Sequence, residues 1–380
     1  MNNTSHFKVE KSILIPLILL SLISIITIYS AQGIISDSYG NVFMKQIIWV
    51  IVGFGIAYGL MAIGNNFLYK NIWYLYGFGI LVLIFLLIAP ESIAKTINGS
   101  KCWFKMFGIG TIQPSEFMKI ILILATSRLV HEFNEETLEP TIKDELKLLL
   151  KVGLVFLIPS ILTFLQPDTG VVIIYFVIVL SILFVSGIRY RWFILLLSIV
   201  AVAIGLLLLI HNLNQDLFIN IFGTNFFYRI DRLLFWQEGT GMQLENALAS
   251  IGSAGLFGHG FNVNQIYFPE AHTDFIFAVF ASNFGLFGAF AFIILLIFFD
   301  SRIINMASKN INVINKYAIA GIFGMLIFQQ FQSIGMTIGL LPIMGITLPF
   351  ISYGGSSYLS YMIIMGVVFN ISNETIRYKN

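Results

Sequence analysis

Charge is scarce in this 380-residue chain, and so is cysteine. Lysine, arginine, aspartate and glutamate together make up 11% of the residues, whereas hydrophobic residues make up 58% and the mean hydropathy is +0.89. A soluble domain does not need so much apolar surface. The single cysteine, Cys102, excludes an internal disulfide and a cysteine-rich metal site. The net charge of +2 gives no support to nucleic-acid binding.

Several well-known chemical signatures are also absent. The sequence has no P-loop, no dinucleotide-binding fingerprint, no H-E-x-x-H motif and no G-x-S-x-G elbow. Nucleotide-driven transport therefore has no support in this sequence.

Long apolar runs are what the sequence has in abundance. Each is about 17–25 residues long, which is enough to cross a bilayer as a helix. We predict an all-α polytopic membrane protein with ten transmembrane helices. The predicted spans are 12–29, 47–63, 72–89, 114–130, 148–165, 171–188, 192–210, 275–299, 317–338 and 346–369. The first is long for a signal peptide and no A-x-A-like site follows it, so we expect it to be retained.

The distribution of lysine and arginine predicts the orientation. If the chain starts inside, fourteen of these residues fall on inner segments and six on outer segments, as the positive-inside rule requires. Both termini are then cytoplasmic, and residues 212–273 form a large extracellular loop between the seventh and eighth spans. Within this loop the sequence TGMQ at 240–243 matches a capping box, and a short amphipathic helix over 241–251 follows. We find no long linker and no repeat, so residues 1–380 are predicted to form one membrane domain.

The segment 269–274, with sequence PEAHTD, lies where the long loop meets the eighth span. An aspartate at this border, beside a histidine, can serve as a general base. Asp274 can equally cap the following helix, because aspartate accepts hydrogen bonds from orphan backbone N–H groups. From these residues alone the two interpretations weigh the same.

Glu116 and Lys119 lie three residues apart on the fourth span and therefore share one helix face. Charged groups at membrane depth normally face a protein interior or a water-filled cavity. A structural ion pair behind the start signal Pro114 is the competing interpretation. Asp168, in the sequence QPD at 166–168, is expected to cap the sixth span rather than to act in catalysis.

Arg229 and Arg232 lie in the long loop, and arginine suits phosphate because its fork donates two parallel hydrogen bonds. Pairing with the headgroups of membrane lipids would need the same two arginines, so this is the competing interpretation. The tenth span contains LPFISYGGSS at 348–357. Proline and paired glycines free backbone groups that lipid cannot satisfy, so this stretch either lines a polar groove or serves close helix packing.

Taken together, these motifs resemble the SEDS family, the RodA and FtsW type of bacterial cell-wall polymerase. The resemblance is carried in order by NGSK at 98–101 with Trp103, QPSEF at 113–117 with Lys119, QPDTG at 166–170, IGS at 251–253 with GLFG at 255–258, PEAHTDF at 269–275, GLLP at 339–342 and PFISYGGSS at 349–357. Each motif is weak alone, but the ordered set over ten spans is specific.

The resemblance implies a peptidoglycan glycosyltransferase that polymerises lipid II at the outer face of the bacterial cytoplasmic membrane. It also implies a class B penicillin-binding protein as transpeptidase partner, and Asp274 as the essential residue, the general base of an inverting transfer. The other residues that we expect to contact the substrate are Lys101, Trp103, Glu116, Lys119, Arg229, Arg232, His272, Ser352 and Ser356. A divalent cation, Mg²⁺ or Mn²⁺, is one group that could stabilise the leaving pyrophosphate. A lipid II flippase is the alternative function that the same features allow.

Overall fold

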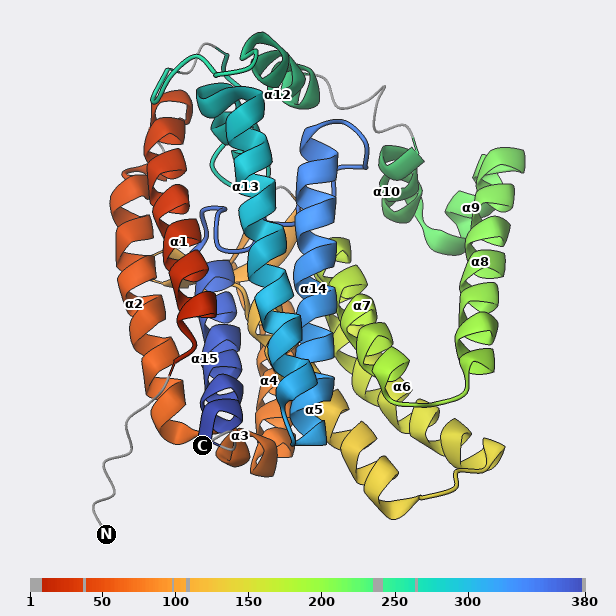
Figure 1. The fold of residues 1–380 in the computed structure, drawn as a ribbon. Coiled ribbons are helices and arrows are strands. Elements are labelled where there is room, and N and C mark those ends of the chain that lie inside the picture. Colours follow the sequence, from red (N-terminus) through yellow and green to blue (C-terminus); the bar gives the residue numbers. More distant parts are fainter. Residues whose placement is uncertain are drawn as a thin grey trace.

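The computed structural model describes residues 9–36, 39–97, 99–106, 110–234, 242–263 and 266–377 (Figure 1). Its elements in chain order are α1 (Lys11–Ala31), the 3-10 turn η1 (Gln32–Ile34), α2 (Val42–Ile63), α3 (Asn65–Lys70), α4 (Ile72–Ile88), β1 (Ala94–Ile97), β2 (Ser100–Met106), β3 (Gly110–Ile112), α5 (Pro114–Glu136), α6 (Ile142–Leu165), α7 (Thr169–Val185), α8 (Tyr190–Leu213), α9 (Gln215–Phe222), α10 (Thr224–Leu234), α12 (Met242–Ser253), α13 (Ile276–Lys309), α14 (Val313–Thr337) and α15 (Gly355–Arg377).

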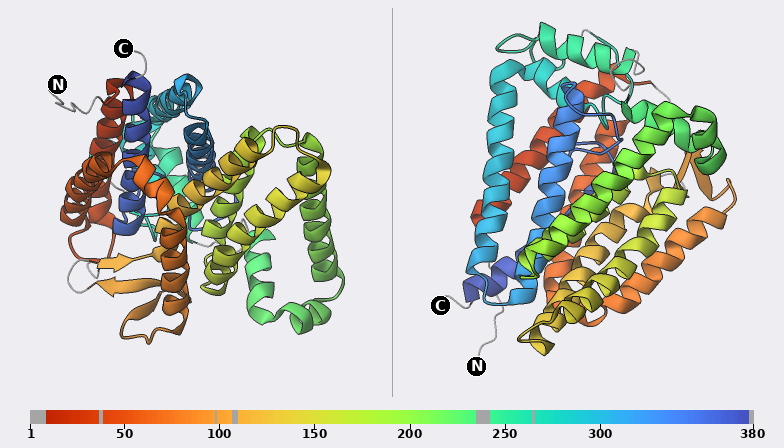
Figure 2. Two further views of the ribbon diagram at one scale, coloured as in Figure 1. Left: turned by 90° about the horizontal axis from the view of Figure 1, so that it is seen from below. Right: turned by 90° about the vertical axis from the view of Figure 1, so that its right-hand side faces the viewer.

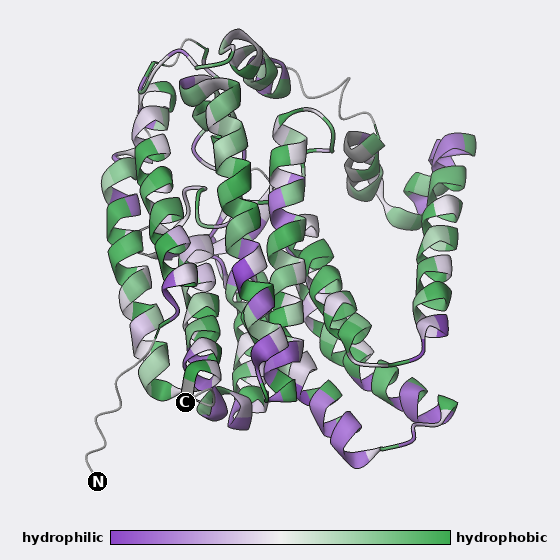
Figure 3. Ribbon diagram, in the orientation of Figure 1, coloured by the Kyte–Doolittle hydropathy of each residue, from purple (hydrophilic) through white to green (hydrophobic). Residues whose placement is uncertain are grey.

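Most of these helices have the length and composition of membrane spans. Seven of the described helices are long and apolar enough to cross a bilayer, and α4 and α7 are shorter apolar helices. The helix α5 fails that test because charged residues interrupt it, although it coincides with the predicted span 114–130. Figure 3 shows apolar residues over the middle of the bundle and hydrophilic ones at the lower ends of α5 and α6. The chain is a polytopic membrane protein, and each of the ten predicted spans overlaps one helix.

The helix α15 is the centre of the bundle. It packs against α2 and α5, whereas α14 packs against α7, α13 and α5, and α1 packs against α13. About 78% of the apolar window of α15 is buried, against 28% for α2, so α15 is surrounded by protein rather than by lipid. The predicted start of the tenth span was wrong. Residues 346–354 are not helical, and α15 begins only at Gly355.

A small sheet departs from the all-α prediction. Strands β1, β2 and β3 form one antiparallel sheet in that order, between α4 and α5. Trp103 on β2 pairs with Lys95 on β1, and Phe104 pairs with Ile112 on β3. The sequence carries no signal for this sheet, because its strands are short and mix polar with apolar residues.

The helix α8 stands apart from the bundle (Figures 1 and 2). None of the residues in its apolar window is buried within the protein. Its C-terminal end is folded onto α9 and α10 by an aromatic cluster in which His211 stacks on Phe227 at 4.7 Å between ring centres. The rings of Phe164 on α6 and Phe226 on α10 lie 6.0 Å apart between their centres, which connects α10 to the bundle. The long loop is thus partly helical, and α12 corresponds to the predicted helix 241–251, although the expected capping residues 240 and 241 lie outside the described residues.

Local sequence signals explain where several helices begin. The α5 helix starts at Pro114, which needs no N–H partner in the first turn. Asp168 caps α7, as predicted, by accepting a hydrogen bond from the backbone N–H of Val171 at 3.3 Å. Thr141 and Asp144 form a reciprocal capping box at the start of α6.

Gly285 breaks α13, with φ 66° and ψ −164°. The glycine-rich loop after α12 fills the break, because Leu286 and Phe287 donate backbone hydrogen bonds to Gly255 and Leu256 at 3.0 and 3.1 Å. A Cβ on Gly285 would lie 2.3 Å from the backbone nitrogen of Gly258. The loop therefore satisfies backbone groups that the break leaves open, which a membrane protein cannot leave to lipid.

Candidate active site

The segment 269–275 folds as a tight turn in front of α13. Glu270 has a positive φ of 55°, and its carbonyl accepts hydrogen bonds from the backbone N–H groups of Thr273 and Phe275 at 3.2 and 3.1 Å. The hydroxyl of Thr273 donates to the Glu270 carboxylate at 2.6 Å. The N-cap of α13 is Phe275, with no side-chain cap hydrogen bond, so the interpretation of Asp274 as a helix cap was wrong.

The turn 348–353 holds this segment from the other side. The hydroxyl of Ser352 donates to the carbonyl of Thr273 at 2.7 Å and accepts from the N–H of Leu348 at 2.9 Å. The N–H of Tyr353 donates to the carbonyl of His272 at 2.9 Å. Two motifs that the sequence places 79 residues apart thus form one structural unit, and Ser352 supports the backbone beside Asp274.

His272 is buried between two aromatic rings. Its side chain lies 4.6 Å from the ring of Tyr39 and 5.5 Å from that of Tyr353, between ring centres, and the residue is 2% exposed. Burial lowers the pKa of the imidazole, and the carboxylate of Glu270 opposes this effect. The enclosed imidazole packs the site and shapes it. The sequence predicted that His272 contacts the substrate, and this contact stays a prediction.

Asp274 has the electrostatics of a base that works near neutral pH. Burial raises the pKa of its carboxyl to about 7, and the nearby carboxylate of Glu270 contributes in the same direction. The side chain is nevertheless partly exposed, and within the described residues no hydrogen bond occupies its oxygens. A carboxylate with free oxygens can accept a proton from a bound hydroxyl group.

Close contacts of the loop between α14 and α15 bring the QPDTG motif at 166–170 near Asp274. A Cβ on Gly345 would lie 3.8 Å from Oδ2 of Asp274, and Gly345 has a φ of 66°. On the other side of the same loop, a Cβ on Gly170 would lie 2.7 Å from the carbonyl oxygen of Met344. The QPDTG and PEAHTD motifs therefore meet across the loop between α14 and α15. The contact at Gly170 leaves no room for a side chain, and the positive φ of Gly345 favours glycine there.

A second polar cluster surrounds Asp168. Its Oδ2 accepts hydrogen bonds from the amide of Gln113 at 2.6 Å and from the hydroxyl of Ser115 at 3.2 Å. Gln113 in turn accepts from the indole N–H of Trp103 at 3.1 Å. Ser356 accepts from the backbone N–H of Gln113 at 2.9 Å and donates to the carbonyl of Thr111 at 3.1 Å, so it joins β3 to α15, and its contact with substrate stays a prediction.

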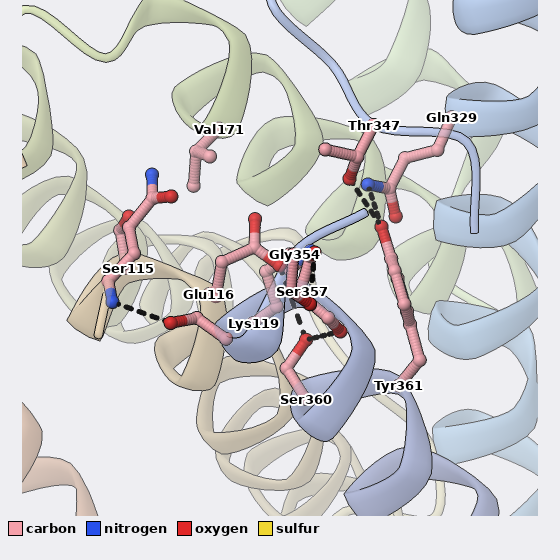
Figure 4. A network of polar contacts seen from close by, with 12 residues as sticks. Ser115, Glu116, Lys119, Val171, Gln329, Thr347, Gly354, Ser357, Ser360 and Tyr361 are labelled. Atoms are coloured by element: carbon pink, nitrogen blue, oxygen red, sulfur yellow. Dashed lines mark hydrogen bonds and ion pairs between the residues drawn. The ribbon is translucent and has the colours of Figure 1, made fainter. Parts of the chain in front are cut away.

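Glu116 and Lys119 form a buried ion pair, as their spacing had indicated (Figure 4). The ammonium of Lys119 lies 2.7 Å from the Glu116 carboxylate, with side-chain exposures of 0% and 6%. Ser360 on α15 donates to the same carboxylate at 3.3 Å, and the ring of Tyr361 lies 4.7 Å from the Lys119 nitrogen. Tyr361 also contacts Thr347 at 3.2 Å, which links the pair to the loop beside Asp274.

The cationic residues that the sequence predicted to contact the substrate lie on elements other than the turn 269–275. Lys101 donates to the carbonyls of Leu87 and Ala89 at the end of α4, so it stabilises a helix terminus. Arg229 and Arg232 lie on α10, with their side chains outside the described part of the chain. Lys45, which the sequence did not single out, donates at 3.1 Å to the carbonyl of Tyr39, the residue whose ring packs edge-on against His272.

The described residues give limited support to a protein-held metal. Among them no group of three His, Cys, Asp or Glu side chains could hold an ion. Glu270 and Asp274 are the two carboxylates of the turn, and Mg²⁺ commonly takes one or two carboxylates together with substrate phosphates. The divalent cation thus stays a prediction that depends on the substrate, and no step below requires it.

Comparison with known proteins gives the family. A model of the cell cycle proteins FtsW, RodA and SpoVE matches residues 10–377. The chain belongs to this family. A protein of Coxiella burnetii named as a probable peptidoglycan glycosyltransferase FtsW is 34% identical to this chain over 98% of both lengths. A protein of the same name from Nitrosomonas europaea is 32% identical over 94% of this chain and 91% of its own.

Solved structures of the family share the fold. A chain of a peptidoglycan synthase complex, described as coordinating polymerization and crosslinking, superposes with a TM-score of 0.78 over 99% of this chain and 100% of its own, at 23% identity. The rod shape determining protein RodA of Thermus thermophilus superposes with a TM-score of 0.69 over 97% of each chain, also at 23% identity. The resemblance of the sequence to the SEDS family is confirmed.

Proposed function

We propose that this chain is a peptidoglycan glycosyltransferase that polymerises lipid II, with Asp274 as the general base. Membership of the FtsW and RodA family supports the reaction class. The observation that carries the role of Asp274 is its environment. Burial raises the pKa of its carboxyl to about 7, and the carboxyl lies in a turn that a second motif holds in place, while its oxygens remain available.

The reaction requires one proton acceptor. The hydroxyl oxygen of the acceptor sugar attacks the anomeric carbon of the donor sugar, and Asp274 takes the hydroxyl proton as that bond forms. The bond between the anomeric carbon and the diphosphate oxygen breaks from the opposite side, so the configuration inverts. A positioned base contributes about a hundred- to ten-thousand-fold to such a rate. The diphosphate leaves as an anion and needs charge stabilisation more than a proton, so one carboxylate suffices.

The lipid anchors of the substrates favour a site at the membrane border. Turn 269–275 lies immediately before α13, and loop 338–354 runs back into the bundle beside it. A lipid-linked sugar could therefore present its head group to Asp274 while its tail stays in the bilayer. Holding two anchored substrates in this way turns a bimolecular encounter into a local one.

We place both termini in the cytoplasm and residues 212–273 outside, in the bacterial cytoplasmic membrane. The excess of lysine and arginine on the assigned inner segments supports this orientation. We also propose a class B penicillin-binding protein as the partner that cross-links the strands. The support is the similarity to a chain of a complex described as coordinating polymerization and crosslinking.

The test is lipid II polymerisation by purified protein in detergent, together with the partner transpeptidase. Asp274→Asn removes the proton acceptor without removing a helix cap, so we expect normal folding and partner binding but a rate at least about a hundredfold lower. Asp216→Asn, on the exposed first turn of α9 in the same loop, is the matched control and should keep the wild-type rate.

Two results would contradict the proposal. Near wild-type polymerisation by Asp274→Asn would require another base. Absence of glycan product from wild-type protein and partner in detergent would favour the alternative, a lipid II flippase, because detergent removes the two sides that transport needs. A purely scaffolding protein would likewise give no polymer that depends on Asp274.

A further inference from the structure

Strand β2, which carries Trp103, is attached to the turn between α6 and α7. The hydroxyl of Ser100 donates to the carbonyl of Pro167 at 3.3 Å, and the thiol of Cys102 donates to the carbonyl of Gln166 at 2.8 Å. These contacts fix the backbone of the strand against the bundle. They leave the orientation of the half-buried indole of Trp103 to be set by its own partners.

Side-chain hydrogen bonds then connect Trp103 to the same turn. The indole N–H donates to Oε1 of Gln113 at 3.1 Å, and Nε2 of Gln113 donates to Oδ2 of Asp168 at 2.6 Å. The other carboxylate oxygen of Asp168 accepts the backbone N–H of Val171 at the start of α7. The chain of bonds therefore runs from a helix N-terminus, through a carboxylate and an amide, to an indole.

This chain of bonds allows only one orientation of the central amide. An indole N–H can only donate, and an ionised carboxylate can only accept. Gln113 must consequently turn its oxygen toward Trp103 and its nitrogen toward Asp168. A hydrogen bond to a charged group is stronger than one between neutral groups, so Asp168 fixes the amide, and the amide fixes the plane of the indole.

We infer that Gln113 and Asp168 are positioning residues that orient the indole of Trp103 for the sugar of the substrate. The rigid face of a tryptophan offers a large apolar surface on which a sugar ring can rest, and its value depends on its angle. The sequence had predicted capping alone for Asp168. The contact between the indole and the sugar rests on the proposed function. The orientation of the indole does not, because it can be measured without turnover.

The test exchanges donor and acceptor along the chain of bonds. In Gln113→Glu two carboxylates meet, so the side chain turns away and releases Trp103. In Asp168→Asn no arrangement satisfies Trp103, Gln113 and Val171 together, because one donor always meets another. The double variant Gln113→Glu/Asp168→Asn restores every pair, since the new amide caps α7 with its oxygen and donates to the new carboxylate, which still accepts from Trp103. Its net charge equals that of the wild type.

The first readout is fluorine-19 NMR of the full chain labelled with 5-fluorotryptophan. The sequence has five tryptophans, so the spectrum assigns Trp103 as the resonance that Trp103→Phe removes. We expect both single variants to shift or broaden that resonance and the double variant to return it to its wild-type position. Ser115→Ala removes a different hydrogen bond to Asp168 and should leave the resonance in place.

The second readout is steady-state polymerisation of lipid II by the full chain with its partner transpeptidase. Loss of one orienting hydrogen bond should raise KM about two- to tenfold in each single variant, with a smaller change in kcat, and the double variant should recover. An unmoved Trp103 resonance in both single variants would overturn the inference, as would a double variant no better than the worse single one.

The two proposals can fail separately. Asp274→Asn should slow turnover at least about a hundredfold and leave the Trp103 resonance unchanged. If that variant is active while the exchange experiment behaves as expected, the base is wrong and the positioning of Trp103 stands. If the resonance behaves as expected but KM does not change, the hydrogen bonds orient Trp103 and the indole does not serve the substrate, which overturns the inference.

Discussion

The hydroxyl of Ser352 donates a hydrogen bond to the carbonyl of Thr273 at 2.7 Å. The acceptor is the peptide group that leads directly into Asp274, and the same hydroxyl accepts from the N–H of Leu348. One serine therefore connects the loop before α15 to the turn before α13. The position of the proposed base is set by a segment far away in the sequence, and not by the helix that follows it.

The pH dependence of polymerisation should report Asp274. The ionised form is the base, so the rate should fall as pH decreases through about 7, the pKa to which burial, and then Glu270, raise this carboxyl. Glu270→Gln removes a nearby negative charge, lowers the pKa of Asp274 and should move the acidic limb to lower pH. Rate profiles between pH 5 and 9 would measure the shift, and Glu245→Gln, an exposed change on α12, should leave the profile where it is.

The buried pair Glu116–Lys119 should show a non-additive response. Lys119→Met leaves the Glu116 carboxylate buried without its cation, which costs about 3–5 kcal/mol. Glu116→Gln/Lys119→Met removes both charges and should be more stable than Lys119→Met alone. Thermal unfolding in detergent of the wild type, the two single variants and the double variant would give the coupling. Losses that simply add would show that the two side chains do not interact.

Gly285 should resist replacement. Alanine there would have to adopt a backbone conformation that is essentially restricted to glycine, at about 1–3 kcal/mol, and its Cβ would collide with the backbone of Gly258 and Leu256. Gly285→Ala should therefore lower the unfolding temperature and loosen the loop after α12. Gly153→Ala, in the middle of α6 with open space around it, is the control and should be neutral or slightly stabilising. Equal melting temperatures for the two variants would mean that the break in α13 tolerates a side chain.

The proposed orientation can be tested with an impermeant thiol reagent on intact cells. The native Cys102 is buried, and burial raises the pKa of its thiol, so it should react little. Tyr228→Cys, at an exposed position of α10, should be labelled from outside. Leu138→Cys, exposed between α5 and α6, should be labelled only after lysis. The reverse pattern would invert the topology and place Asp274 on the wrong side of the membrane for an outer-face reaction.

The sequence alone was sufficient wherever the deciding interactions are local. Apolar runs of bilayer length predicted ranges that each overlap a helix. The spacing of Glu116 and Lys119 predicted a pair because residues three apart share a helix face. The cap at Asp168 was correct because its acceptor and the Val171 N–H lie within one turn. The ordered motifs gave the family for a similar reason, since they are properties of the chain and not of its packing.

The tertiary structure decided everything that depends on distant partners. The capping role considered for Asp274 was wrong because Glu270 and Ser352, and not the α13 terminus, hold its turn. Lys101 and Ser356 bind backbone groups that no spacing rule identifies. The amide of Gln113 has a defined direction only because Trp103 and Asp168 approach it from two other elements. Hydrogen bonds of this kind form when packing brings donors and acceptors together, and a sequence read one turn at a time does not contain that information.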